Sequence, residues 1–182
     1  MINRDANNEY AQKHFDRACR KYEEALGVFR YYEATSPDWQ SKGIDDDHLK
    51  EVDYIGKNAE QKKIVENLKL NCYMNIASCN IKTKAFAIAI AACDEVLKLS
   101  PKNAMAFYRR ARATALPINA GVPDLRKAIK DLELVIKLSK QTKGLKYDYV
   151  IKEQQRVQAL IDLNYQRERD TYAKMFESKH SI

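Results

Sequence analysis

The sequence predicts an all-α fold, a right-handed helical solenoid of three helix–turn–helix repeats followed by a long C-terminal capping helix. The first observation is an internal match, because Asn75-Ile76-Ala77 and Arg109-Arg110-Ala111 superimpose after a shift of 34 residues. The second is composition, since only 5 Gly and 4 Pro occur and good helix formers dominate. One such unit cannot bury its own apolar face, so several must stack and leave a groove on their inner side.

The first repeat is expected at about residues 1–33. Its helices are predicted to run from near Asn3 to Lys13 and from Phe15 to about Tyr31. Ala6 and Ala18 stand twelve residues apart within them. Small residues at such positions let paired helices approach closely.

An insertion is expected at about residues 34–57, where helical periodicity is lost. Turn and breaker signals recur through it: Ser36-Pro37, Lys42-Gly43, Asp45-Asp46-Asp47 and Ile55-Gly56. The stretch is longer than most connections. We expect either a mobile loop or a segment that contains one short helical turn.

The second repeat is expected at about residues 58–101 and is the clearest of the three. Its first helix is predicted to begin near Asn58, and Ala77 and Ala89 are again twelve residues apart. Ser100-Pro101 ends the second helix, because proline disfavours helical geometry in the residue before it.

The third repeat is expected at about residues 102–140 and opens at Asn103 or Ala104. Its matching alanines, Ala111 and Ala128, are seventeen residues apart, so five residues are inserted in the turn between its helices. A surface turn tolerates such an insertion.

The capping helix is expected at about residues 145–178. Its apolar face comprises Val150, Val157, Leu160, Ile161 and Leu163. The stretch from Arg167 to Lys179 is polar on every side and is expected to project into solvent.

Composition bounds the class of protein. The 182 residues fit one domain, and the formal charge of +7 favours acidic partners or simple solubility. Basic and acidic residues alternate, as in Lys130-Asp131-Leu132-Glu133, which indicates solvated helix faces and argues against a nucleic-acid partner.

The longest apolar run, Ala85–Cys93, is too short to span a membrane. The N-terminus holds no secretory signal and starts almost inside a helix, which suggests a fragment of a longer protein.

The cysteines indicate a reducing compartment. Four occur, at positions 19, 72, 79 and 93, all in predicted helices and none with the spacing of zinc ligands. Buried, reduced thiols in a cytoplasmic protein are the expected state, and disulfides are the alternative.

Few residues could carry catalysis, so the chain itself is not expected to be an enzyme. The histidines, His14, His48 and His180, have no metal-ligand spacing and no recognisable nucleophile nearby. Asp45-Asp46-Asp47 lacks the spaced ligands and glycine of a calcium loop. No metal or cofactor is predicted, and only a constellation around His48 and these aspartates would make an enzyme.

The predicted groove offers different chemistry. Asn7, Asn75 and Arg109 are expected on the inward face of the first helix of each repeat, where core packing does not explain polar side chains. An arginine fork with two amides suits a carboxylate. Tyr22, Phe86 and Phe107 are interpreted as core packing.

The repeats resemble tetratricopeptide repeats, and in particular those of immunophilin co-chaperones: FK506-binding proteins, cyclophilins and aryl-hydrocarbon-receptor-interacting-protein-like adaptors. The resemblance rests on Asn75-Ile76-Ala77-Ser78-Cys79, Phe107-Tyr108-Arg109-Arg110-Ala111 and Tyr172-Ala173-Lys174-Met175-Phe176. It implies an interaction module that holds the acidic C-terminal peptide of a heat-shock chaperone. It also implies that a peptidyl-prolyl isomerase domain could precede this chain.

In that family a two-carboxylate clamp uses Lys and Asn, then Asn, then Lys and Arg from successive repeats. The matching positions here are Asn3 and Asn7, Asn75, and Met105 and Arg109, so three of five agree and both lysines are missing. Arg4, Lys82 and Arg112 are candidates to restore the lost charge, and a one-residue shift would pair Arg4 with Asn8. The alternative is a repeat adaptor with a degenerate clamp that scaffolds another partner.

Overall fold

The computed structural model describes residues 2–35, 49–140 and 148–179. Within these ranges the chain forms seven α-helices and one two-stranded sheet, so the fold class is the helical one that the sequence predicts. The residues group into two compact units, 1–83 and 84–182. The expectation of a single domain over residues 1–182 stays a prediction.

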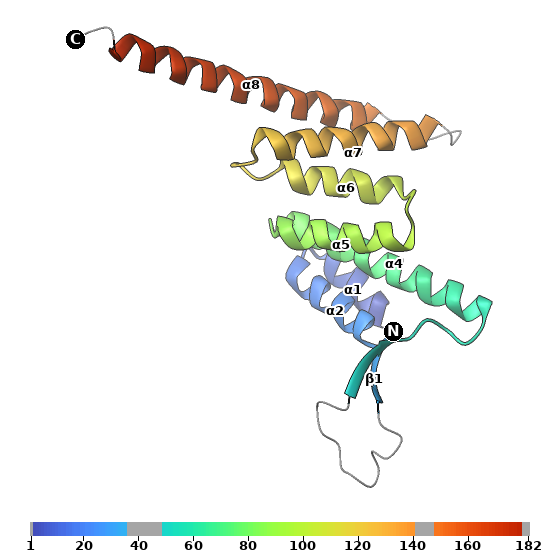
Figure 1. Cartoon of the computed structure of the whole chain (residues 1–182). Coiled ribbons are helices and arrows are strands. Elements are labelled where there is room, and N and C mark those ends of the chain that lie inside the picture. Colours follow the sequence, from blue (N-terminus) through green and yellow to red (C-terminus); the bar gives the residue numbers. More distant parts are fainter. Residues whose placement is uncertain (1, 36–48, 141–147, 180–182) are drawn as a thin grey trace. The chain divides into compact units, whose positions relative to one another are not determined.

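The first unit is built on three helices, α1 (Ile2–Ala11), α2 (Phe15–Gly27) and α4 (Ala59–Lys82). Helix α2 packs against both α1 and α4 (Figure 1). Ala6 and Ala18 are fully buried, which confirms that small residues occupy the close approach. Tyr22 fills the space beside them and is also buried.

A β-hairpin follows α2, where the sequence predicted more helix and then a loop. Strands β1 (Arg30–Ala34) and β2 (Leu49–Asp53) pair antiparallel, with Tyr32 opposite Glu51. Helix α2 therefore ends four residues before Tyr31, so the predicted end of this helix was wrong. The prediction that the insertion holds no strand was also wrong, because β2 lies within it. The possible helical turn, Asp45-Asp46-Asp47 and His48 lie outside the described residues.

The turns that open the second helix of the first two repeats share one backbone geometry. Lys13 and Lys84 both have a φ of 64°, although neither is glycine. The residues after them, His14 and Ala85, have φ,ψ angles of −82°,65° and −81°,64°. Two turns 71 positions apart thus repeat the same unusual conformation, as expected of a structural repeat.

Asparagine caps begin two helices where the sequence predicts helix starts. The Asn58 side chain accepts a hydrogen bond from the Gln61 backbone N–H at 2.8 Å, at the start of α4. The Asn103 side chain does the same for Ala106 at 3.0 Å. Each cap satisfies a backbone donor that lacks an intrahelical partner.

The second unit stacks four helices in chain order: α5 (Phe86–Leu99), α6 (Ala104–Ala115), α7 (Val122–Lys140) and α8 (Asp148–Lys179). Consecutive helices pack against each other (Figure 1). The core joins α6, α7 and α8 through nine buried side chains: Ala111, Ala115, Leu125, Ala128, Leu132, Val135, Val150, Val157 and Ile161.

Helix α8 agrees with the predicted capping helix in its apolar face, with one exception. Val150, Val157 and Ile161 are buried, whereas Leu163 is 45% exposed and so was wrongly assigned to the packed face. Residues 167–176 are all exposed, as their polarity predicts. No helix in the described ranges combines the length and apolar character that a membrane span needs.

Candidate functional site

In the first unit, the exposed side chain of Asn7 is tied to the buried interior. The Tyr22 hydroxyl donates a hydrogen bond of 2.5 Å to the Asn7 side-chain oxygen. Tyr22 is 2% exposed, and burial raises the pKa of its hydroxyl to about 12. This bond uses one of the two lone pairs of the Asn7 amide oxygen and fixes which end of the amide faces Tyr22, so its N–H donors point away from the Tyr22 hydroxyl.

Asn75 lies on α4 and is half-buried. Three residues further along, Ser78 is hydrogen-bonded to Tyr10 at 2.7 Å, which joins α4 to α1. Asn7 likewise stands three residues before Tyr10. Each asparagine is therefore one helical turn before the same interhelical contact, and on the same face as its contacting neighbour.

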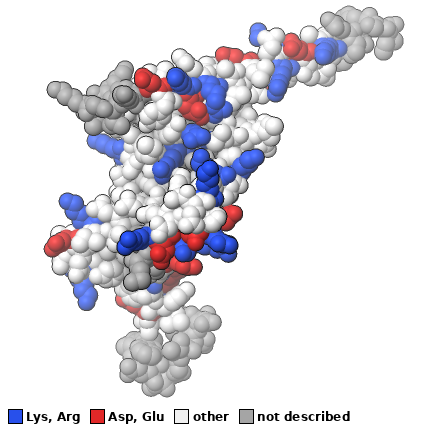
Figure 2. Space-filling model, turned by 180° about the vertical axis from the view of Figure 1, so that it is seen from behind, with Lys and Arg blue, Asp and Glu red and all other residues white. Residues whose placement is uncertain are grey.

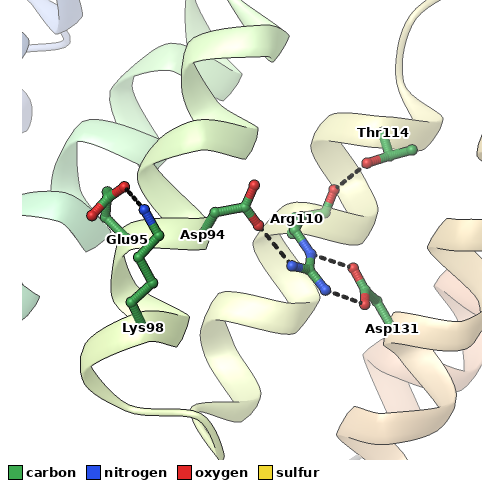
Figure 3. A network of polar contacts seen from close by, with 6 residues as sticks. All are labelled: Asp94, Glu95, Lys98, Arg110, Thr114 and Asp131. Carbon is green, nitrogen blue, oxygen red and sulfur yellow. Dashed lines mark hydrogen bonds and ion pairs between the residues drawn. The ribbon is translucent and has the colours of Figure 1, made fainter.

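In the second unit, Arg110 is held at the centre of an ion-pair network (Figure 3). Its Nε and Nη2 donate to the two carboxylate oxygens of Asp131 on α7, at 2.8 and 2.7 Å. Its Nη1 donates to Asp94 on α5 at 2.6 Å. Hydrogen bonding to these carboxylates raises the pKa of Arg110, mainly through Asp131. Arg110 thus connects three helices, and Asp131 is 7% exposed, contrary to the solvated face predicted for it.

Arg109, adjacent to Arg110, is half-buried on α6. Its charge lies near the Cys93 thiol on α5, whose pKa it acts to lower, although burial dominates and raises that pKa to about 12. Arg110 is bonded to Asp94 and Asp131, and Arg109 is the member of the pair at the position that the family resemblance matches.

The other sequence-predicted site residues differ in exposure and contacts. Met105, one turn before Arg109, is 41% exposed. The Arg112 guanidinium lies 5.9 Å from the centre of the Tyr108 ring. Arg4 and Lys82 are exposed, at the two ends of the first unit's helices α1 and α4. The side chain of Asn3 lies outside the described residues, although its backbone belongs to α1.

The cysteines carry free thiols, and three of the four are buried. Cys19 is the exception to the predicted burial, being half-buried, with a pKa raised to about 11 chiefly by desolvation. A thiol with a raised pKa is a poor nucleophile because little thiolate forms near neutral pH. In the part of the chain that the structure describes, no group of three or more His, Cys, Asp or Glu side chains could hold a metal ion.

Sequence reasoning missed two features of these sites. The Tyr22–Asn7 bond was missed because Tyr22 was interpreted as core packing alone, although a buried tyrosine hydroxyl needs a partner. The Arg110 network was missed because its aspartates lie 16 and 21 positions away. Basic and acidic side chains are interspersed over the face shown in Figure 2.

The paired helices, buried alanines and repeated turn geometry define a helical-repeat protein of the tetratricopeptide type. No family model matches the chain. Over 120 residues, or 66% of its length, the chain is 30% identical to the mouse peptidyl-prolyl cis-trans isomerase FKBP4, of which the match covers 24%. The chain therefore spans about a quarter of the curated relatives that it matches.

Solved structures support the same fold. The C-terminal tetratricopeptide-containing domain of a Plasmodium falciparum FK506-binding protein is similar with a TM-score of 0.60 and 20% identity, covering 93% of this chain and 89% of that one. The Hsp90 co-chaperone Cns1 of Saccharomyces cerevisiae is similar with a TM-score of 0.58 and 17% identity, covering 99% of this chain and 43% of that one. The myosin chaperone UNC-45 of C. elegans, solved with an Hsp90 peptide, is similar with a TM-score of 0.55 and 19% identity, covering 94% of this chain and 14% of that one. The chain is thus similar to the tetratricopeptide repeat part of co-chaperones and of FK506-binding proteins.

Proposed function

We propose that the chain is a co-chaperone module that binds the acidic C-terminal peptide of a heat-shock chaperone through Asn7, Asn75 and Arg109. The observation that carries this proposal is the Tyr22–Asn7 hydrogen bond, because it makes an exposed amide a donor at a position where the resemblance expects one. The N–H donors of an exposed amide suit a carboxylate ligand.

The second unit contributes a cation. Arg110 is bonded to Asp94 and Asp131, and we assign the ligand carboxylate to Arg109, the position that the family resemblance matches. An arginine fork can bind a carboxylate through two parallel hydrogen bonds. The name of one neighbour supports the ligand class, since UNC-45 was solved with an Hsp90 peptide.

The two absent lysines set the expected affinity. Each charged hydrogen bond contributes roughly 1.5–3 kcal/mol. Arg4 and Lys82 are exposed and Arg112 is half-buried, so they are the groups that we propose restore part of the lost charge. Binding weaker than that of a complete clamp is expected.

The test is a calorimetric titration of the chain with a peptide that ends in Glu-Glu-Val-Asp, with a free or an amidated C-terminus. The free peptide should bind, and amidation should weaken it by at least about tenfold, the effect of losing one charge-assisted bond. Asn75→Ala and Arg109→Ala should weaken the free peptide similarly. Lys127→Ala is the control, because Lys127 is exposed on α7 and pairs with Asp124 three positions before it. Binding indifferent to amidation would reject the proposal.

A second candidate function is supported by the apolar residue at one lysine position. Met105 is 41% exposed on α6, where the clamp of the resembling family has a cation. A polarizable thioether favours an aliphatic ligand side chain. The chain would then be an adaptor with a degenerate clamp, and Met105→Lys would strengthen binding of the Glu-Glu-Val-Asp peptide while weakening the true ligand.

The proposed module would work in the cytoplasm, where four free thiols persist. It could form the C-terminal part of a peptidyl-prolyl isomerase, as its similarity to FKBP4 suggests. The isomerase activity would then belong to residues outside the 182 of this chain.

A further inference from the structure

A pocket lies in the second unit, between the end of α6, the α6–α7 turn and the middle of α8. Its volume is about 260 Å³. Ala115 and Leu125 are buried at its base, at 2% and 1% exposure. It shares no residue with the proposed clamp, since Arg109 stands six positions before Ala115 on α6.

The turn that lines this pocket contains the insertion that distinguishes the third repeat. Pro117, Ile118 and Ala120 all line the pocket, and Ile118 is fully exposed. From α8 come Leu160 and Leu163. Leu163 is the residue of the predicted apolar face that the helix bundle leaves 45% exposed. The inserted turn and Leu163 thus form one apolar surface.

The rim of this pocket is cationic. Eleven described residues line it, and of these Arg156, Asn164 and Arg167 are polar while none is acidic. Glu153 holds Arg156 through two hydrogen bonds, of 3.1 and 2.8 Å. Arg167 is exposed on the projecting part of α8. An apolar lining beside the exposed Arg167, with no carboxylate among the lining residues, is complementary to an apolar side chain next to an acid.

Its volume of about 260 Å³ is enough for one aliphatic side chain. Sites for small molecules commonly enclose about 300–1,000 Å³, and this pocket is smaller. Apolar anchors seated in pockets of this kind dominate many protein interfaces.

We propose that this pocket is a second interaction site, which takes an aliphatic side chain of a partner segment whose neighbouring residues are acidic. A carboxylate of that segment faces Arg167, while Arg156 stays bonded to Glu153, and its aliphatic side chain enters beside Leu160 and Leu163. The proposal is independent of the proposed clamp.

The test is an NMR titration of the full chain with acetyl-Asp-Glu-Leu-Glu-Asp-amide, which has no free C-terminal carboxylate. Backbone signals of Ala115 and Ala120 should shift and saturate. Replacing the central Leu of the peptide by Ser should weaken binding by at least about tenfold, the value of burying one aliphatic side chain. Asn75→Ala should leave this titration unchanged, which separates it from the clamp.

Matched variants of exposed residues on α8 locate the site. Leu163→Glu and Arg167→Glu should each weaken binding by at least about fivefold, because one removes apolar surface and the other reverses the rim charge. Ile151→Glu and Arg169→Glu are the controls, since both residues are exposed on the same helix and neither lines the pocket. Equal binding of the Leu and Ser peptides would overturn the proposal. The proposal would also be overturned if, in the absence of peptide, the Ala115 signal moved with protein concentration. That result would indicate a second copy of the chain as the occupant of the pocket.

Discussion

Tyr22 shows how one buried side chain can prepare an exposed one. Its ring fills the space between α1 and α2, and its hydroxyl reaches Asn7 at 2.5 Å. Phenylalanine at this position could serve packing alone, but the tyrosine hydroxyl also fixes the orientation of the Asn7 amide. The residue thus connects the core of the first unit to its proposed ligand site.

Tyr22→Phe should separate these two roles. The phenyl ring preserves the packing while the hydrogen bond is lost, so the free energy of unfolding should fall by about 1 kcal/mol. Affinity for the Glu-Glu-Val-Asp peptide should fall several-fold because the Asn7 amide can then rotate. Urea unfolding and calorimetry measure the two effects.

Tyr10→Phe is the matched control, since it removes another tyrosine hydrogen bond between helices of this unit, the bond to Ser78. It should cost comparable stability and leave affinity close to that of the unchanged chain. An equal loss of affinity in both variants would show that Tyr22 has no orienting role.

Arg110 is the corresponding residue of the second unit, because it joins α5, α6 and α7 through Asp94 and Asp131. Arg110→Met should lower the free energy of unfolding by about 3 kcal/mol, since the buried Asp131 carboxylate loses its partner. Arg110→Met with Asp131→Leu should recover most of this loss, as an apolar pair needs no counter-ion. Urea unfolding measures the stability of both variants. A double variant no more stable than Arg110→Met alone would contradict the view that Arg110 stabilises the fold by neutralising Asp131.

At the scale of elements, the helices could be predicted and the hairpin could not. Helix starts at Asn58 and Asn103 carry a local capping signal. The strand Arg30–Ala34 is exposed along its whole length, so it lacks the apolar alternation that marks a half-buried strand. Its pairing with Leu49–Asp53 is a non-local interaction that no local pattern specifies.

Gly56 determines how the hairpin connects to α4. Its φ is 92°, and a Cβ at this position would lie 2.5 Å from the Lys62 backbone nitrogen. Gly56→Ala should therefore lower the free energy of unfolding by about 2 kcal/mol or more, since both strain and a backbone clash arise. Thermal unfolding followed by circular dichroism measures the loss.

Gly27→Ala, at the end of α2, is the control. No atom lies within 4 Å of its added Cβ, so this variant should be neutral or stabilising by up to about 1 kcal/mol. Equal losses of stability in Gly56→Ala and Gly27→Ala would show that the positive φ and the backbone clash at Gly56 are not the cause.

At the scale of the molecule, the sequence could predict the fold class because the repeat encodes it locally in each unit. Buried alanines at positions 6, 18, 77, 89, 111 and 128 recur through the three repeats. The proposed site is harder to predict, because the identities of Asn7 and Arg109 say nothing of their partners. The contacts of Tyr22 and Arg110 show side chains that the fold itself holds, and no local pattern of the sequence encodes those contacts.

The affinity of the chain for its proposed acidic ligand should depend on the salt concentration. The chain carries a net charge of +7, and the proposed ligand is acidic, so attraction between them should weaken as the Debye length shortens from about 10 Å at 0.1 M to about 3 Å at 1 M salt. Affinity for the Glu-Glu-Val-Asp peptide, measured by calorimetry, should fall about tenfold or more over that range. A clamp of charged hydrogen bonds requires this dependence, whereas an apolar contact at Met105 does not. Affinity that held constant in salt would therefore favour the degenerate clamp, with Met105 and not Arg109 as the main contact.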